Sequence, residues 1–416
     1  MEKKTILMLP SWYPTKENPF QGSFFREQAI IVQDKFDFIV FHLKYKNVPL
    51  IIYLFHLFFS KNKAFINNQE FNITEYTSKF FIPVYFKFYI IAYNFIQKII
   101  LKRREDGTGS FVPESYISFL RKKIKKILRK SKEINYDFVY GVTAQDKAIE
   151  AQLFACENNK PYILAEHAPF PWPGTTISDK QKLAIENADL FLAISNDKIR
   201  QVLLQNIKLK NIKYIGNLVD EKMFPFEPVS HAQKTFLIVA ANSFYKQYSM
   251  LIKTFDELKK LCNKEFKLII AGYNANKGYS KKAEELTDQL KASSFFENVE
   301  LIPRVERKEL YKLYNRSDCF IMTSIQEGQP VSALEAACCG LPVFSTRCGG
   351  VEDYITSENG RIFEITDYKS FALSLNDFLN DKLKFDKQKI RKIIISKFGI
   401  NAFINNFTEC FEKLGE

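Results

Sequence analysis

The chain has 416 residues and a mass of 48.6 kDa, a length that predicts two or three domains. Its 46% apolar and 26% charged residues are ordinary values for a soluble globular protein, which excludes the intrinsically disordered, collagen-like and disulfide-scaffold classes. A formal net charge of +13, together with 40 Phe and 20 Tyr, favours an anionic partner such as nucleic acid, an anionic membrane surface or a phosphorylated small molecule.

The excess positive charge is concentrated in the first half of the chain. Residues 1–226 hold 33 Lys and Arg against 22 Asp and Glu, a net of +11, whereas residues 227–416 hold 27 against 25, a net of +2. We therefore expect the two halves to meet different partners. Nucleic acid is the least favoured of the anions, because no zinc-finger, RNP-like or helix-turn-helix signature accompanies the charge.

Short apolar runs, rich in β-branched and aromatic residues, recur along the chain and are separated by helical patterns. The predicted strands lie at 5–9, 36–41, 137–141, 161–165, 190–195 and 212–215, and then at 236–241, 266–271, 299–302, 319–323 and 342–345. This alternation, twice over, predicts an α/β fold with two doubly wound parallel sheets. The polar, proline-containing stretch 224–234 is the best linker, so we place the domains at 1–226 and 227–395.

Two aromatic segments of the first half, residues 51–60 and 80–101, are either buried core helices or membrane-surface contacts. The second is only marginally long enough to span a bilayer, and its internal Lys87 and Lys98 argue against a span. The run 121–132 carries eight positive charges and no acid. It is either a solvated amphipathic helix or a footprint for a membrane surface or polyanion, and both alternatives stay open.

The cysteine and histidine patterns indicate reduced thiols and no zinc site. The seven Cys are odd in number and contain no C-x-x-C pair, which favours a cytoplasmic protein. The four His lie far apart and pair with no Cys at ligand spacing. The apolar run after the N-terminal Met-Glu-Lys-Lys, residues 5–10, is too short for a secretory signal and is better interpreted as a first strand.

The most informative stretch is residues 317–355, SDCFIMTSIQEGQPVSALEAACCGLPVFSTRCGGVEDYI. An apolar strand ends at Ser324, a short loop follows, and a helix is expected to start at Pro330 and to end before Gly340. Ligands bind at the carboxyl ends of the strands in such folds. The backbone amides of residues 329–332 and the Ser332 hydroxyl would therefore meet an anion at the helix N-terminus, and a diphosphate suits this site without a metal.

Two glutamates of this stretch are candidates for binding hydroxyl groups. Glu327 lies in the loop and Glu335, eight residues later, lies in the helix, so the two can reach opposite ends of one ligand. Carboxylates accept well from the vicinal hydroxyls of a sugar or a ribose. The alternative, that Glu335 is a surface residue, is weakened by its apolar neighbours, which make the helix look buried and would require partners for a carboxylate.

The stretch resembles the signature of the retaining glycosyltransferases of family 4, since Glu-x7-Glu lies within EGQPVSALEAACCGLPV and is followed by CGGVEDYI. Three earlier segments agree: LPSWYPTKENPFQGSFFREQA, ILAEHAPF, and ADLFLAISNDKIRQVLL followed by NLVDEKMF. The resemblance implies the GT-B fold, in which two Rossmann-like domains face each other across a cleft, with a C-terminal helix at 396–416 packing back on the first domain. It is weak at about 45–135, where such enzymes vary with the acceptor.

The resemblance also implies roles for particular residues. A nucleotide diphosphate sugar would bind in the C-terminal half without a metal or other cofactor, with Glu335 at the ribose hydroxyls and Glu327 at the sugar near the reacting carbon. His167 would lie at the junction of sugar and acceptor, and would be catalytic together with Glu327. Lys246 would neutralise charge on the leaving group. The expected donor-binding residues, in addition to Glu335, are Gly22, Lys246, Gly328, Gln329, Pro330, Val331 and Ser332.

Plainer interpretations accompany several of these residues. Lys246 could be a solvated loop residue, Gly22 could serve only a positive-φ turn, and His167 could be structural. Glu166 could bind acceptor hydroxyls or cap a loop. One departure from the family pattern is the lack of an Arg shortly before Lys246, since AANSFYK leaves a single point charge there. Arg304 and Arg347 are the candidates to compensate.

The sequence therefore predicts a cytoplasmic glycosyltransferase, peripheral on the inner face of the membrane, that moves a sugar with retention to a hydroxyl of a glycan. The expected acceptor is lipid-linked, as in surface or capsular polysaccharide biosynthesis. The alternatives are a nucleotide-sugar epimerase or a sugar phosphorylase of the same fold, and a non-catalytic protein that binds sugars or polyanions.

Overall fold

The computed structural model describes residues 3–15, 21–49, 73–83, 135–172, 175–230, 232–274 and 280–414. The aromatic segment 51–60 and the basic run 121–132 lie outside these residues. Of the aromatic segment 80–101 only residues 80–83 are described, and they end a strand instead of starting a helix. The chain forms two compact units, each treated by itself below. The first comprises Met1–Ile194, Lys198–Ile215 and Ile404–Glu416, and the second comprises Ser195–Asp197 and Gly216–Phe403.

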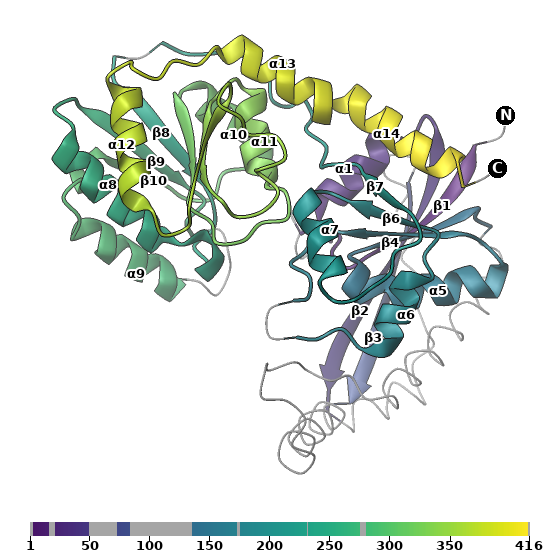
Figure 1. Cartoon of the computed structure of the whole chain (residues 1–416). Coiled ribbons are helices and arrows are strands. Elements are labelled where there is room, and N and C mark those ends of the chain that lie inside the picture. The colour runs from purple at the N-terminus through teal and green to yellow at the C-terminus, as the bar shows by residue number, and fades with distance from the viewer. Residues whose placement is uncertain are drawn as a thin grey trace. The chain divides into compact units, whose positions relative to one another are not determined.

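The first unit is built on a seven-stranded parallel sheet in the order β3-β2-β1-β4-β5-β6-β7 (Figure 1). All five residues of β4 are buried, as expected for a central parallel strand with helices on both faces. The strands are β1 Lys4–Pro10, β2 Phe36–Val48, β3 Ile73–Pro83, β4 Phe138–Val142, β5 Tyr162–Glu166, β6 Leu190–Ala193 and β7 Ile212–Tyr214. The helices are α1 Ser23–Ile31, α5 Ala144–Asn158, α6 Asp179–Glu186, α7 Asn196–Leu203 and α14 Ile400–Glu412.

The second unit is built on a six-stranded parallel sheet in the order β10-β9-β8-β11-β12-β13. Its strands are β8 Lys234–Val239, β9 Phe266–Ala271, β10 Val299–Ile302, β11 Cys319–Met322, β12 Val343–Thr346 and β13 Gly360–Phe363. Its α-helices are α8 Tyr248–Leu261, α9 Ser280–Lys291, α10 Leu310–Asn315, α11 Val331–Cys338, α12 Tyr368–Leu379 and α13 Lys387–Phe398. Three 3₁₀ turns, η2 Phe244–Lys246, η3 Phe296–Asn298 and η4 Arg307–Glu309, precede α8, β10 and α10.

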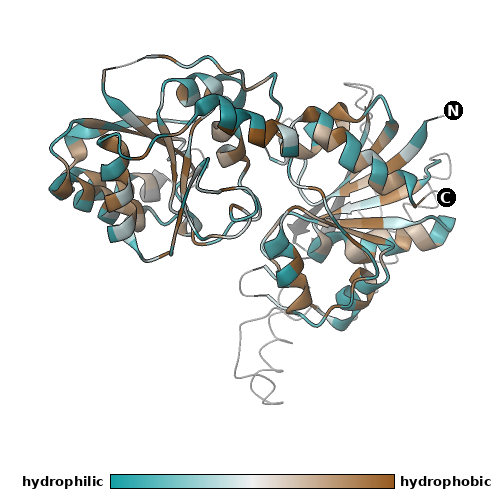
Figure 2. Cartoon of the chain, turned by 45° about the horizontal axis from the view of Figure 1, so that its top comes forward, coloured by the Kyte–Doolittle hydropathy of each residue, from teal (hydrophilic) through white to brown (hydrophobic). Residues whose placement is uncertain are grey.

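The predicted fold class is confirmed, because both sheets are parallel and doubly wound. In both sheets the central strands carry the hydrophobic stretches, while the helices mix hydrophobic and hydrophilic residues (Figure 2). Each of the eleven predicted strands is present, with ends shifted by at most about two residues except in β2, which runs to Val48 instead of residue 41. Two strands, β3 and β13, were not predicted, because the first seven residues of β3 (ITEYTSKFFIP) are mostly polar and β13 (GRIF) has only four residues.

The C-terminal segment contains two helices instead of one. The sequence predicts one unbroken helix at 396–416, but in the structure α13 ends at Phe398 and α14 begins at Ile400, with Gly399 between them. Residues 404–416 belong to the first unit, and α14 packs there through two stacked rings, Phe407 and Phe411. Phe411 meets Phe138 and Tyr140 edge-on, with ring centroids 5.4 and 5.8 Å away. These contacts attach the last helix to β4, the central strand of the first sheet.

Candidate functional site

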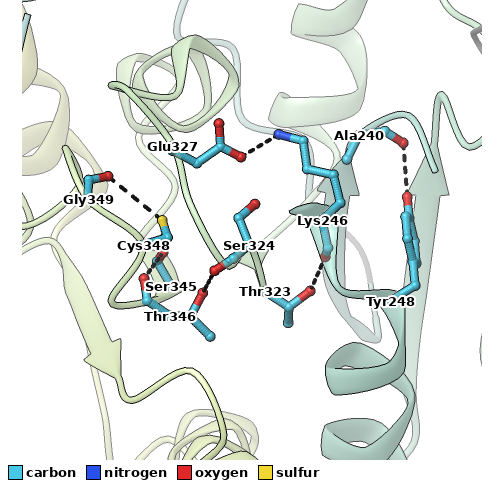
Figure 3. Close-up of polar contacts among 10 residues, drawn as sticks. All are labelled: Ala240, Lys246, Tyr248, Thr323, Ser324, Glu327, Ser345, Thr346, Cys348 and Gly349. Atoms are coloured by element: carbon cyan, nitrogen blue, oxygen red, sulfur yellow. Dashed lines mark hydrogen bonds and ion pairs between the residues drawn. The ribbon is translucent and has the colours of Figure 1, made fainter. Parts of the chain in front are cut away.

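Lys246 and Glu327 meet at the carboxyl edge of the second sheet. Lys246 ends η2, which follows β8, and Glu327 lies in the loop after β11. Because β8 and β11 are parallel neighbours, the segments that follow them emerge side by side. The Lys246 Nζ lies 2.6 Å from Glu327 Oε1, and the two side chains are 24% and 17% exposed (Figure 3). The structure thus brings together the predicted phosphate-binding cation and the predicted catalytic carboxylate.

Hydrogen bonds hold the two loops in register. Thr323 Oγ1 donates to the Lys246 carbonyl over 3.0 Å (Figure 3). The Ile325 amide donates to the Tyr245 carbonyl over 2.8 Å. The Glu327 amide donates to the Cys348 carbonyl over 2.7 Å. A Cβ at Gly350, whose φ is +73°, would lie 2.0 Å from the Gly328 carbonyl oxygen. Glycine at this position therefore allows the 349–350 turn to support the Glu327 loop.

The N-terminus of α11 lies in the same loop and is ready to bind an anion. The helix begins at Val331, with Pro330 at the N-cap, one residue later than predicted. The first helical hydrogen bonds are donated by Ala333 and Leu334 to the Pro330 carbonyl. The amides of Val331 and Ser332 precede these bonds, and no side chain caps the helix. These amides and the helix dipole suit a phosphate group.

Gln329 is oriented by a different segment. Its side chain is buried, and its Oε1 accepts a hydrogen bond from the Asn217 amide. Asn217 Nδ2 in turn donates to the Gln329 carbonyl over 2.8 Å. Gln329 thus joins the loop before α11 to the segment between β7 and β8. Its side-chain oxygen already accepts a hydrogen bond within the protein.

Glu335 is buried in α11, at 2% exposure, and is bonded through both oxygens. Arg307 Nε donates to Oε1 over 2.8 Å, and Tyr314 Oη donates to Oε2 over 2.9 Å. Burial, with the neighbouring Glu335 charge as the next cause, raises the pKa of Tyr314 well above its ordinary value. The sequence indicated that a buried carboxylate needs partners, but it did not identify Arg307 or Tyr314.

The two arginines that could replace the missing family Arg have other neighbours. Arg347 Nε pairs with Glu364 Oε1 at 2.8 Å, on the exposed surface. The Arg304 backbone amide donates to Asn274 Oδ1 over 3.2 Å. Compensation by either residue at a bound phosphate stays a prediction.

In the first unit, Gly22 and His167 are linked through the aromatic residues of α1. Gly22 is the N-cap of α1 with φ +69°, and a Cβ there would lie 2.6 Å from the Trp12 carbonyl oxygen. The His167 ring, just after β5, meets Phe25 edge-on at 4.9 Å between centroids and Phe24 at 5.7 Å. The start of α1 and the β5 loop therefore form one cluster.

Glu166 is fully buried at the end of β5 and accepts two backbone hydrogen bonds. Gln145 donates its amide to Oε2 over 3.1 Å from the first turn of α5, and Ala168 donates to Oε1 over 2.7 Å. Burial raises the pKa of the Glu166 carboxyl to about 7, although these two amides and Lys198 act in the opposite direction. This is the loop-capping alternative for Glu166, and its binding of acceptor hydroxyls stays a prediction.

Buried polar side chains from α5 and α7 hold the loop that carries His167. Gln145 Oε1 accepts from the Trp172 amide over 2.7 Å, and Gln201 Oε1 accepts from the Phe170 amide over 3.0 Å. Lys198, which has no exposed surface, donates to the same Gln201 oxygen over 2.8 Å. The sequence contained no signal for these supports, because they come from helices far along the chain.

The raised pKa of Glu166 predicts a pH-dependent stability of the first unit. Because the folded state binds this proton more tightly than the unfolded chain, whose pKa is the ordinary 4.5, the contribution is full below about pH 4.5 and is lost as the pH rises through about 7. The shift corresponds to about 3 kcal/mol. We expect Glu166→Gln to flatten this dependence, even though replacing one acceptor by an NH₂ lowers stability at every pH.

Urea unfolding at pH 5 and pH 8, followed by tryptophan fluorescence, measures this effect. Both tryptophans of the chain, Trp12 and Trp172, lie in the first unit and so report on it. The wild type should lose more stability than Glu166→Gln between the two pH values. Equal losses would show that Glu166 does not take up a proton in this range.

Comparison with known proteins agrees with this geometry. A family model for glycosyl transferases group 1 matches residues 219–395, which is most of the second unit. An uncharacterized glycosyltransferase of Haemophilus influenzae is 24% identical over 290 residues, 68% of this chain and 78% of that protein. A galactosyltransferase of Escherichia coli that acts on GlcNAc-diphosphoundecaprenol is 30% identical over 107 residues, 25% of this chain and 28% of that protein.

Solved structures match over nearly the whole length. The apo form of the lipopolysaccharide outer core galactosyltransferase WaaB has a TM-score of 0.66 and 18% identity, covering 98% of this chain and 99% of that one. Anabaena Alr3699/HepE, solved with UDP and glucose, has a TM-score of 0.66 and 15% identity, covering 99% and 100%. The fold is GT-B. Together with the sequence relatives, it supports a glycosyltransferase.

None of the helices in the described part of the chain is long and apolar enough to cross a membrane. In the same parts of the chain, no three His, Cys, Asp or Glu side chains are grouped as ligands of a metal ion. The seven cysteines are free thiols, and six of them are buried.

Proposed function

We propose that the protein is a retaining glycosyltransferase of family 4, which transfers a sugar from a nucleotide diphosphate sugar to a hydroxyl of a glycan. The observation that carries the proposal is the contact of Lys246 with Glu327 beside the N-terminus of α11. Few other functions need a cation, a carboxylate and helix amides together at the carboxyl edge of a parallel sheet.

In the proposed reaction, the bond between the sugar C1 and the diphosphate oxygen breaks. The acceptor hydroxyl oxygen attacks C1 from the same face, and its proton goes to the departing phosphate. Lys246 and the amides of Val331 and Ser332 stabilise the charge that develops on the leaving group. In the proposal these groups compensate the negative charge of the leaving group without a metal. The second half therefore needs no large net positive charge to bind the donor.

The other predicted residues have supporting roles in the proposal. Arg307 and Tyr314 orient the Glu335 carboxylate, and in the proposal this carboxylate accepts from the ribose hydroxyls. Gly328, Gln329 and Pro330 shape the loop around the sugar, chiefly through the backbone. His167 and Gly22 belong to the first unit, and the catalytic role of His167 and the donor-binding role of Gly22 stay predictions.

A transfer assay with nucleotide sugars and glycan acceptors tests the proposal. We expect release of nucleoside diphosphate that depends on the acceptor, and a product with the donor's anomeric configuration by NMR. Conversion of the donor without an acceptor would indicate an epimerase, and a requirement for inorganic phosphate would indicate a phosphorylase. Binding of donor without any product would leave the non-catalytic alternative.

We further propose that the acceptor is lipid-linked, and that the protein works at the cytoplasmic face of a membrane in surface polysaccharide assembly. Two observations support this: the net +11 of residues 1–226, and the lipid-linked substrate in the name of the Escherichia coli relative. Flotation with vesicles containing phosphatidylglycerol should recover the protein at low salt and release it at high salt. Absence from the floated fraction at low salt would overturn membrane association.

A further inference from the structure

A cavity of about 500 Å³ lies beside the Lys246 loop, entirely within the second unit. It is formed by the segment from η2 into α8, by α9, and by Ile325 in the loop after β11. The lining side chains used below are Phe244, Gln247, Ser249, Glu285, Gln289 and Ile325. None of them belongs to the predicted donor-binding set, and a volume of this size holds a small ligand.

The cavity differs chemically from the neighbouring Lys246–Glu327 contact. Phe244 and Lys246 belong to the same short 3₁₀ turn, but Lys246 extends to Glu327 (Figure 3), whereas Phe244 lines the cavity. Among the described lining residues Glu285 is the charged one, and none is a Lys or Arg. These residues offer a phosphate no cationic side chain, which favours an uncharged occupant.

The lining offers an aromatic ring for the C–H groups of a neutral sugar and polar side chains for its hydroxyl groups. The Phe244 ring is 74% exposed, which is unusual for a large apolar side chain, and offers a flat surface on which sugar C–H groups stack. Gln247 Oε1 is buried and, within the described part of the chain, accepts no hydrogen bond. Gln289, Ser249 and the Glu285 carboxylate add donors and acceptors for hydroxyl groups.

We propose that this cavity is a binding subsite for a neutral glycan, of one or two sugar units, separate from the donor. The glycan would be part of the acceptor, and in that sense the assignment deepens the proposed function. Binding of a free glycan needs no transfer chemistry, so it can be tested even if the chain proves to catalyse another reaction. The donor sugar has the same chemistry and must be distinguished by competition.

Saturation-transfer NMR on the full chain tests the subsite. The probes are the methyl glycosides of glucose, galactose and N-acetylglucosamine, together with maltose and lactose. We expect transfer to at least one probe, and a dissociation constant at least fivefold higher in Phe244→Ala. Leu373→Ala, which shortens another exposed apolar side chain of this unit (53% exposed), is the matched control and should bind as the wild type does.

Three results would overturn the proposal. The first is the absence of transfer to every probe in the wild type. The second is equal transfer in Phe244→Ala, since the ring would then take no part in binding. The third is complete displacement of the glycan by UDP-glucose or UDP-galactose, because the cavity would then be the donor-sugar pocket. Thermal unfolding of each variant verifies that the fold is retained.

Discussion

Glu327→Gln is expected to lower turnover by at least about 100-fold while tightening the binding of a nucleoside diphosphate. Glu327 Oε1 lies 2.6 Å from Lys246 Nζ, so this carboxylate forms an ion pair with the ammonium group that would bind the phosphate. A neutral amide cannot compete as well for the ammonium. A partly exposed ion pair is worth on the order of 1 kcal/mol, so removing the competitor should lower the Kd of the diphosphate about fivefold.

The matched control is Glu358→Gln. This change has the same chemistry and breaks a Lys–Glu pair, to Lys389 at 2.7 Å, in an exposed part of the same unit. It should leave both turnover and Kd unchanged. Unchanged turnover in Glu327→Gln would favour the non-catalytic alternative, and weaker diphosphate binding would contradict the competition between Glu327 and phosphate for Lys246.

Arg307→Ala is expected to destabilise the second unit by about 3 kcal/mol and to weaken donor binding. The substitution removes the Nε hydrogen bond to Glu335 and leaves a carboxylate with 3% of its side chain exposed without its cation. Such a charge costs far more than the loss of a surface pair. Arg307→Lys should recover only part of the loss. Lysine restores the positive charge beside Glu335, but its ammonium is a point charge and lacks the planar fork of the guanidinium.

Hydrogen exchange followed by mass spectrometry measures this prediction unit by unit. A two-unit chain need not unfold in one step, and both tryptophans lie in the first unit, so fluorescence would miss the effect. Peptides from α11 and β11 should exchange faster in Arg307→Ala. The control, Arg316→Ala, removes an exposed arginine paired with Glu300 at 2.8 Å and should change exchange little. Equal effects of the two variants would contradict a special role for Arg307.

The parts of the site that lie in one continuous stretch were predictable from the sequence. The Glu327 loop and α11 follow a short apolar strand and end at a glycine, so local pattern is sufficient there. The two doubly wound parallel sheets followed in the same way from repeated apolar runs, whereas the GT-B fold was implied by the family resemblance. The helix began at Val331 instead of Pro330, because proline serves there as the N-cap.

The supports of the site could not be predicted, because they depend on contacts between distant segments. Arg307 and Tyr314 reach Glu335 from η4 and α10, and Gln201 reaches the His167 loop from α7. Nothing in the local sequence around these residues distinguishes them from surface side chains. Only the folded chain shows that each donates or accepts a hydrogen bond at a buried position.

The central claim is that the second unit binds a nucleoside diphosphate at Lys246, Glu327 and the N-terminus of α11. Isothermal titration of the full chain with UDP, GDP, ADP and dTDP, in the wild type and in Lys246→Ala, tests it most directly. We expect saturable one-to-one binding of at least one of them, and an affinity at least about tenfold lower in Lys246→Ala. Absence of binding by all four, or an unchanged affinity in Lys246→Ala, would contradict it.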